Sequence, residues 1–307
     1  MNKIVIAGGA GSLIKVLVQY FLAEGAEVVV LSRSIRQTKN NLRFVEWDGL
    51  SLGAWVAEME NADVVINLAG KTINCRHTKD NKKEIISSRI NATTIIGKAI
   101  QECKYPPKLW INASSAAIYI NTGEAYADEN TSHTDDFTAN VSKQWESAFY
   151  EVQTPHTRKI ALRIGVVLTA KGGMLEPLFK LAKYWLVGTA GSGKQYISWI
   201  HENDFVKLIR FFMTNENISG SINMCTPNSV TNKQFMAAIR KACSVPVNLP
   251  APAFFVKVAA FFMGTEPELI LGGRKVISNV IKATNFSFQF PTVEEAIQDI
   301  ASTKKQL

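Results

Sequence analysis

Short runs of apolar residues alternate with longer amphipathic stretches through the first half of the chain. The runs at residues 3–7, 27–31, 43–46 and 64–68 are rich in valine and isoleucine and are too short to be helices. Between the first two runs, apolar residues recur at helical spacing. Because consecutive positions within these runs are mostly apolar, we expect strands that are buried on both faces of a parallel sheet.

This alternation of strand and helix continues to about residue 165. A long amphipathic stretch over residues 80–103 precedes the strand-like run 108–113, and residues 141–152 precede the run 159–164. Such a pattern requires crossover connections and predicts an α/β fold: a Rossmann-like, doubly wound parallel sheet with helices on both faces. Ligands of such sheets bind at the carboxyl ends of the strands.

The second half of the chain is less regular. Glycines interrupt it between residues 172 and 193, and prolines at 246, 250 and 252 mark a boundary. Helices are expected at 202–214, 253–263, 267–271 and 293–300. We therefore predict a Rossmann domain over residues 1–165, to which residues 196–230 return. A smaller, mostly helical substrate-side region should occupy residues 166–307.

Composition narrows the class of protein. With 307 residues, 47% hydrophobic and 20% charged, the chain resembles an ordinary globular protein of one large domain or two unequal lobes. The apolar run near the N-terminus is too short for a signal peptide or a membrane span, so a cytoplasmic protein is expected. The four cysteines and four histidines are scattered, which predicts neither a disulfide framework nor a metal site.

The net charge of +8 raises the question of an acidic partner. Lysines and arginines are spread along the chain without a dense basic helix, so we rank binding of nucleic acid or of a membrane surface last. A diffuse positive field also attracts a polyphosphate cofactor. We expect a small-molecule substrate, no nucleic acid and no membrane as partners, and we leave open a homodimer, which is common for such sheets.

A glycine-rich turn follows the first strand directly. Its glycines let the backbone turn sharply and approach a pyrophosphate at the N-terminus of the next helix, although a plain tight turn is the alternative. The order of strand, turn, helix and second strand is that of a mononucleotide-binding unit. Ile14 stands where a third glycine is usual, which leaves close packing of the helix on the strand in question. The candidate phosphate-binding residues are Gly8, Gly9, Ala10, Gly11, Ser12 and Leu13.

The end of the second strand favours NADP(H) over NAD(H), which remains the alternative. An acid for the ribose 2′-hydroxyl is absent there, and Ser32, Arg33 and Arg36 stand in its place. A guanidinium pairs two oxygens of a 2′-phosphate at once. Asp48, after the third strand, is placed to accept a hydrogen bond from the adenine amine. Beside the cofactor path, the fourth strand ends in Asn67, Leu68, Ala69 and Gly70.

The chain resembles the extended short-chain dehydrogenases/reductases, the superfamily of NAD-dependent epimerases and dehydratases. The likeness is greatest to an atypical branch of nucleoside-diphosphate-sugar epimerase-like proteins that have a small C-terminal domain. It is carried by residues 4–11, 30–33, 67–70, 88–93, 113–115, 162–168 and 198–204, and in the tail by residues 249–252, 272–276 and 286–291. The resemblance implies NAD(P) binding and a cleft for a sugar or a nucleotide sugar.

The usual catalytic dyad of that family is missing. Its members use a serine and a Tyr-x-x-x-Lys pair on a helix, in which the cation lowers the pKa of the phenol. None of the seven tyrosines of this chain has a lysine four residues later. The remaining candidates are Ser114 and Ser115 at the end of a strand, Tyr119 beyond them, and Lys143 on the following helix.

Four further residues are candidates for the substrate side: Arg76, Arg89, Trp199 and His201. A guanidinium at Arg76 would suit an anionic substrate, although a solvated loop is the alternative. His201 alone would more often be a structural histidine. Two functions stay open: an NADP(H)-binding epimerase or oxidoreductase acting on a sugar-like substrate, and a non-catalytic NADP(H)-binding sensor or regulatory protein that lacks the dyad.

Overall fold

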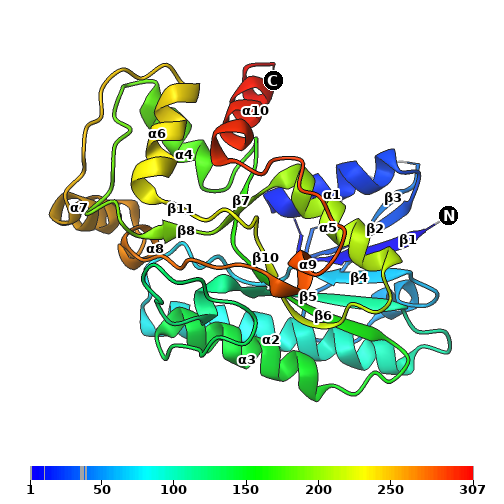
Figure 1. Cartoon of the computed structure of the whole chain (residues 1–307). Coiled ribbons are helices and arrows are strands. Elements are labelled where there is room, and N and C mark those ends of the chain that lie inside the picture. Colours follow the sequence, from blue (N-terminus) through cyan, green and yellow to red (C-terminus); the bar gives the residue numbers. More distant parts are fainter. Residues whose placement is uncertain (1, 10, 35–37, 39, 307) are drawn as a thin grey trace.

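A computed structural model describes residues 2–9, 11–34, 38 and 40–306 (Figure 1). Its centre is a seven-stranded, fully parallel sheet with the strand order β10-β6-β5-β4-β1-β2-β3. The strands are β1 (Lys3–Ala7), β2 (Glu27–Ser32), β3 (Leu42–Glu46), β4 (Val64–Asn67), β5 (Leu109–Ser115), β6 (Arg158–Ile164) and β10 (Gly220–Met224). The order reverses between β1 and β4, which is where doubly wound sheets bind ligands. The predicted Rossmann-like fold is confirmed.

The central strands are mostly apolar because both faces of the sheet are covered. In β1, Ile4 and Ile6 belong to one core cluster, whereas Val5 and Ala7 belong to the cluster on the other face. Helices α1 (Ser12–Ala23) and α5 (Glu202–Thr214) pack on the first face, and α2 (Lys79–Glu102) and α3 (Phe137–Glu151) on the second (Figure 1). Two short 3₁₀ helices, η1 (Ala54–Glu58) and η2 (Ala116–Ile118), lie in the connections.

A smaller lobe with its own apolar cluster lies at the carboxyl ends of the strands (Figure 1). Its main helices are α4 (Leu175–Ala182), α6 (Asn232–Ala242), α7 (Ala253–Met263) and α10 (Val293–Gln306), with the short helices α8 (Glu268–Leu271) and α9 (Asn279–Lys282). Two small ribbons complete it: β8 (Tyr196–Ile197) with β11 (Val230–Thr231), and β7 (Val166–Leu168) with β9 (Trp199–His201). Within residues 196–230, α5 and β10 belong to the central sheet and its cover, whereas β8 pairs inside the smaller lobe.

The structure contains elements that the apolar pattern did not predict. Strand β10, which forms one edge of the sheet, and helices α4 and α6 were missed, and α3 begins at Phe137 instead of residue 141. Asp136 starts α3 because its side chain accepts a hydrogen bond from the Ala139 N–H. No helix in the described part of the chain is long and apolar enough to cross a lipid bilayer.

Candidate cofactor and substrate site

The turn after β1 is a cradle that side chains would fill. Gly8 and Gly9 have φ angles of 138° and 80°, and their N–H groups donate to the Leu31 carbonyl at 3.2 and 3.3 Å. A Cβ on Gly8 would lie 3.0 Å from the carbonyl carbon and oxygen of Leu68. Only glycine fits there, and the backbone of residues 68–69 forms the wall of the cradle.

The N-terminus of α1 opens into the same cradle. Its N-cap residue is Gly11, which has no side chain that could cap the first N–H groups of the helix. The first turn also carries no acidic residue. Unpaired N–H groups and the positive end of the helix dipole therefore suit a phosphate. Ile14 is 4% exposed and joins the core, so the missing third glycine does not keep α1 from packing on the sheet. Ala10 lies outside the described residues.

A loop of the smaller lobe approaches this helix start. A Cβ on Gly172 would lie 3.3 Å from the Cβ of Ser12, so the connection after β7 passes directly over the first turn of α1. A cavity of about 330 Å³ opens beside this loop. It is lined by Ala170, Lys171, Glu176 and Lys304. Its lining carries two ammonium groups and one carboxylate.

The end of β2 presents hydroxyl and guanidinium groups next to the turn. Ser32 is buried, its Oγ accepts the Ser34 N–H at 3.2 Å, and it lies 3.7 Å from the position of a Cβ on Gly9. Arg33 is exposed, and Arg36 lies outside the described residues. Asp48 is also exposed, and its hydrogen bonds to the hydroxyl and N–H of Ser51 and the N–H of Leu50 lower its pKa to about 2.

The segment after β4 contributes backbone rather than side chains. The Asn67 amide is fully buried and donates to Asn112 Oδ1 at 2.7 Å and to Thr93 Oγ1 at 3.1 Å. Its Oδ1 accepts the Ala69 N–H at 3.0 Å. The side chain of Asn67 thus holds the turn from inside, and Leu68 and Ala69 face the cradle through their main chain.

The guanidinium of Arg89, on α2, packs against Gly70, the next residue of this turn. A Cβ on Gly70 would lie 2.9 Å from the guanidinium carbon of Arg89, whose Nη1 donates to the carbonyls of Lys71 and Ile85 at 2.9 Å. Burial lowers the pKa of Arg89 to about 10. Its hydrogen bonds in the described part of the chain go to carbonyls and not to a carboxylate. A partly buried cation of this kind gains from an anionic ligand.

The two serine candidates at the end of β5 have different hydrogen-bond partners and different exposure. Ser114 is buried, and its Oγ donates to Glu146 Oε1 at 2.6 Å. Glu146 is held by Arg163, which donates from Nε and Nη2 at 2.9 and 2.8 Å. Although burial alone would raise the pKa of Glu146, the guanidinium lowers it. Ser115 is only half-buried, and its Oγ accepts the Ala117 N–H at 3.1 Å.

Tyr119 belongs to the same internal network. Its phenol donates to Asn223 Oδ1 and accepts from Arg163 Nη1, both at 2.7 Å, and the residue is fully buried. Burial raises its pKa to about 12, the opposite of the shift that proton transfer near neutral pH requires. Lys143 pairs with Asp135 at 2.6 Å instead. The described contacts do not bring Tyr119 and Lys143 together.

The substrate-side candidates divide into two groups. Arg76 Nη2 donates to the Phe261 carbonyl at 2.7 Å, which ties the loop after β4 to α7. Trp199 is fully buried and donates from its indole N–H to the Asn228 carbonyl. His201 is 1% exposed, its Nδ1 accepts the Asn203 N–H, and burial lowers its pKa. Arg76 is therefore at the junction of the lobes, and the two aromatic residues lie inside the structure.

Glu146 and Arg163 are the residues of this region that the sequence patterns did not single out. The signal was present: Arg163 interrupts the apolar residues 160–164 of β6, and a charged residue in such a run needs a buried partner. In the described residues, no group of three or more His, Cys, Asp or Glu side chains could hold a metal ion.

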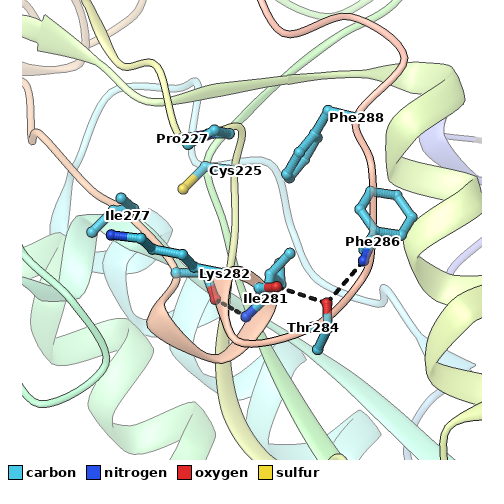
Figure 2. A pocket seen from close by; sticks show the side chains of 9 residues that line it. Cys225, Pro227, Ile277, Ile281, Lys282, Thr284, Phe286 and Phe288 are labelled. Atoms are coloured by element: carbon cyan, nitrogen blue, oxygen red, sulfur yellow. Dashed lines mark hydrogen bonds between the residues drawn. The ribbon is translucent and has the colours of Figure 1, made fainter.

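A second cavity, shown in Figure 2, is lined in part by Cys225 and Pro227, which follow the edge strand β10. It measures about 230 Å³ and has mostly apolar walls. Thr284 fixes one wall, since its hydroxyl donates to the Ile281 carbonyl at 2.7 Å and accepts the Phe286 N–H at 3.2 Å. The lining residues are Cys225, Pro227, Ile277, Ser278, Ile281, Lys282, Thr284, Phe286 and Phe288. None of the site residues predicted from the sequence is among them.

Comparison with known proteins places this geometry in a family. Residues 4–143 match the model of the NAD dependent epimerase/dehydratase family, and residues 251–300 match a domain of unknown function, DUF1731. Epimerase family protein YfhF of Bacillus subtilis is 35% identical over 307 residues and covers 99% of both chains. Epimerase family protein SH2119 of Staphylococcus haemolyticus is 30% identical over 302 residues, covering 98% of this chain and 99% of the relative.

Solved structures of similar fold point to the same family. Human epimerase family protein SDR39U1, crystallised with NADPH, is 28% identical, superposes with a TM-score of 0.87, and covers 98% of this chain and 99% of its own. MoeE5 in complex with UDP-glucose and NAD shares the fold at a TM-score of 0.76 and 17% identity, covering 99% of both chains. The predicted resemblance is confirmed, and the chain belongs to the epimerase family, within the NAD-dependent epimerases and dehydratases of the short-chain dehydrogenase/reductase type.

Proposed function

We propose that this chain is an NADP(H)-binding epimerase or oxidoreductase that acts on a sugar or nucleotide sugar. The observation that carries the proposal is the cradle after β1, where Gly8 has no room for a side chain and the uncapped α1 opens toward the same space. A pyrophosphate fits this arrangement of N–H groups. The relative SDR39U1, which was solved with NADPH, supports the same reading.

The residues at the end of β2 favour the phosphorylated cofactor. Arg33 is exposed beside the hydroxyls of Ser32 and Ser34, so its guanidinium is free to pair a 2′-phosphate. Arg36 and Ala10 are proposed contacts on sequence grounds alone, and Asp48 is a proposed adenine contact. When bound there, the cofactor would supply or accept a hydride.

The chain's own groups would then bind and orient the substrate. Ser115 is the serine proposed to donate a hydrogen bond to a substrate oxygen, because Ser114 is already committed to Glu146. Arg89 and Arg76 supply positive charge for an anionic substrate group. Lys143 is a further candidate, whereas the contacts of Tyr119, Trp199 and His201 give them supporting positions inside the protein.

A non-catalytic NADP(H)-binding sensor is the second candidate. One observation favours it: the Tyr119 phenol is fully buried between Arg163 and Asn223, and its pKa is raised to about 12. A buried phenol engaged by both partners is poorly placed to exchange a proton with a substrate. Both candidates require cofactor binding, and only the first requires turnover.

We expect Ser115→Ala to slow hydride exchange by about 10² while leaving NADPH binding unchanged, since loss of one positioned donor to a reacting oxygen has an effect of this order. The measurement incubates the protein with deuterium-labelled NADPH and a panel of nucleotide sugars and follows transfer of the label by mass spectrometry. Ser115→Thr, which keeps the hydroxyl, should restore most of the rate.

The controls separate the two candidates. Hydride exchange by the Ser115→Ala protein at the wild-type rate would show that Ser115 does not act on the substrate. Absence of exchange in the wild-type protein across the panel, with NADPH binding intact, would overturn the enzyme assignment and favour the sensor.

A further inference from the structure

Helix α7 is apolar on two sides, and only one of them is covered. Val256 and Ala260 are buried against the lobe. The opposite side carries large apolar side chains at the spacing of one helix face. These are Phe254, Phe255, Val258, Phe261, Phe262 and Met263, with exposed fractions from 38% to 82%. Contiguous exposed apolar surface of this kind marks a binding surface in a water-soluble fold.

A neighbouring loop extends this surface. Tyr184, Trp185 and Leu186 are 75%, 57% and 54% exposed. The chain that follows them runs beside the segment leading into α7, since the Gly191 N–H donates to the Ala251 carbonyl at 2.8 Å. Leu249, itself half exposed, lies against Gly188, since a Cβ on Gly188 would collide with the Leu249 carbonyl oxygen. Figure 1 shows these two segments side by side along the outer edge of the smaller lobe, with α7 at their end.

We call this surface the apolar flank and define it by its exposed residues: Tyr184, Trp185, Leu186, Leu249, Phe254, Phe255, Val258, Phe261, Phe262 and Met263.

The chain segments that carry the apolar flank are rich in cationic residues. Residues 177–201 and 217–265 contain no aspartate and no glutamate. Their cationic residues are Lys180, Lys183, Lys194, Lys233, Arg240, Lys241 and Lys257. Lys183 precedes the exposed loop and Lys257 lies on α7, and both are exposed. The acids nearest in sequence, Glu176 and Glu266, stand outside these segments, and Glu266 accepts the His77 N–H. The flank is therefore apolar, and the segments that carry it are cationic, whereas Glu266 and the exposed Glu268 follow α7.

These features select the kind of partner. A second copy of the chain would bring like charges together across the contact, which opposes association. Anionic lipid satisfies both features at once: tryptophan and tyrosine lie at the headgroup level, phenylalanine inserts at the boundary of the acyl chains, and lysines pair with lipid phosphates. We propose that the apolar flank docks on the surface of an anionic lipid bilayer, with α7 lying in the plane of the interface.

This proposal replaces the expectation from sequence that the chain has no membrane partner. That expectation rested on the absence of a membrane-spanning segment and of a dense basic helix from the sequence. Helix α7 is neither of these. Its 11 residues carry a single lysine, and its exposed apolar face becomes visible only when the fold shows which side is buried. The contact is peripheral, since no described helix is long and apolar enough to cross a bilayer.

The test is sedimentation of the full-length protein with vesicles, with no cofactor added. Vesicles of equal parts phosphatidylglycerol and phosphatidylcholine should carry most of the protein into the pellet, whereas pure phosphatidylcholine should carry little. Phe254→Ser/Phe262→Ser and, separately, Lys183→Glu/Lys257→Glu should each lower the partition coefficient by about tenfold or more. Both pairs are exposed, and unchanged melting temperatures check that the variants fold.

A matched control lies elsewhere on the molecule. Tyr105 is 55% exposed in the connection between α2 and β5, next to Lys104, so Lys104→Glu/Tyr105→Ser makes the same kinds of change and should leave vesicle binding unaltered. Absence of wild-type binding to the phosphatidylglycerol vesicles would overturn the proposal. Equal losses in the flank and control variants would overturn it as well. So would a wild-type dimer that Phe254→Ser/Phe262→Ser makes monomeric, found together with no vesicle binding.

Discussion

Replacing Gly8 with alanine is expected to lower the stability of the protein by about 2–4 kcal/mol and to weaken NADPH binding by more than about tenfold. A φ of 138° is strained for any residue with a side chain, and the new methyl group would meet the Leu68 carbonyl at 3.0 Å. Since both contacts are with backbone, the turn itself must move. The melting temperature should fall by about 3–6 °C for a chain of this length.

Gly11 provides the control in the same loop. Its φ is −59°, and a Cβ there would have no neighbour within 4 Å. Gly11→Ala should therefore keep the wild-type melting temperature, yet bind NADPH more weakly because the methyl group enters the space proposed for the pyrophosphate. If Gly8→Ala kept the wild-type stability and the wild-type affinity for NADPH, the turn would tolerate a side chain. NADPH would then not bind in the cradle as proposed.

Breaking the buried ion pair between Glu146 and Arg163 should have the largest effect on stability. Arg163→Met leaves the Glu146 carboxylate buried without its guanidinium, a change that costs about 3–5 kcal/mol. It also removes a hydrogen bond to the Tyr119 phenol. We expect a fall in melting temperature of about 5–8 °C. Lys180→Met is the matched control, because Lys180 pairs with Glu176 on an exposed helix surface where such pairs contribute little.

The same pair predicts a dependence on pH. The folded protein lowers the pKa of Glu146, so its stabilising contribution is present above the ordinary carboxyl pKa and is lost as the pH falls through the folded value. The difference in melting temperature between wild type and Arg163→Met should therefore shrink under acidic conditions. A drop in Arg163→Met no larger than in Lys180→Met at neutral pH would contradict a structural role for the pair.

Apolar patterning predicted the sheet where each strand is apolar on both faces. Strands β1, β2 and β4 were predictable because hydrophobic residues fill nearly all of their buried positions, with Ser32 and Asn67 only at the strand ends. Strand β10 was missed because it carries Ser221 and Asn223, and Asn223 is fully buried. That polar residue is satisfied by Tyr119 and the Ile277 carbonyl, partners more than 50 positions away in sequence.

In the candidate site, too, features set by residues that are neighbours in sequence could be predicted, and features set by residues distant in sequence could not. The glycine turn could be predicted because the demand for glycine arises within one strand–turn–helix unit. The environments of Tyr119 and His201 could not, because they depend on residues brought together by the fold, such as Arg163 and Asp299. The absence of acids from residues 177–201 and 217–265 is visible in the sequence, but it indicates a surface only once the fold shows that α7 exposes its phenylalanines.

The central claim is that NADP(H) binds at the cradle after β1, and a thermal-shift comparison of NADPH, NADP, NADH and NAD tests it most directly. At a concentration about one hundred times its dissociation constant, a ligand adds about 2.7 kcal/mol of stability, which for this chain is a shift of about 4 °C. The account predicts such shifts for NADPH and NADP, smaller ones for NADH and NAD, and loss of the difference in Arg33→Gln. No shift with any of the four nucleotides would contradict it.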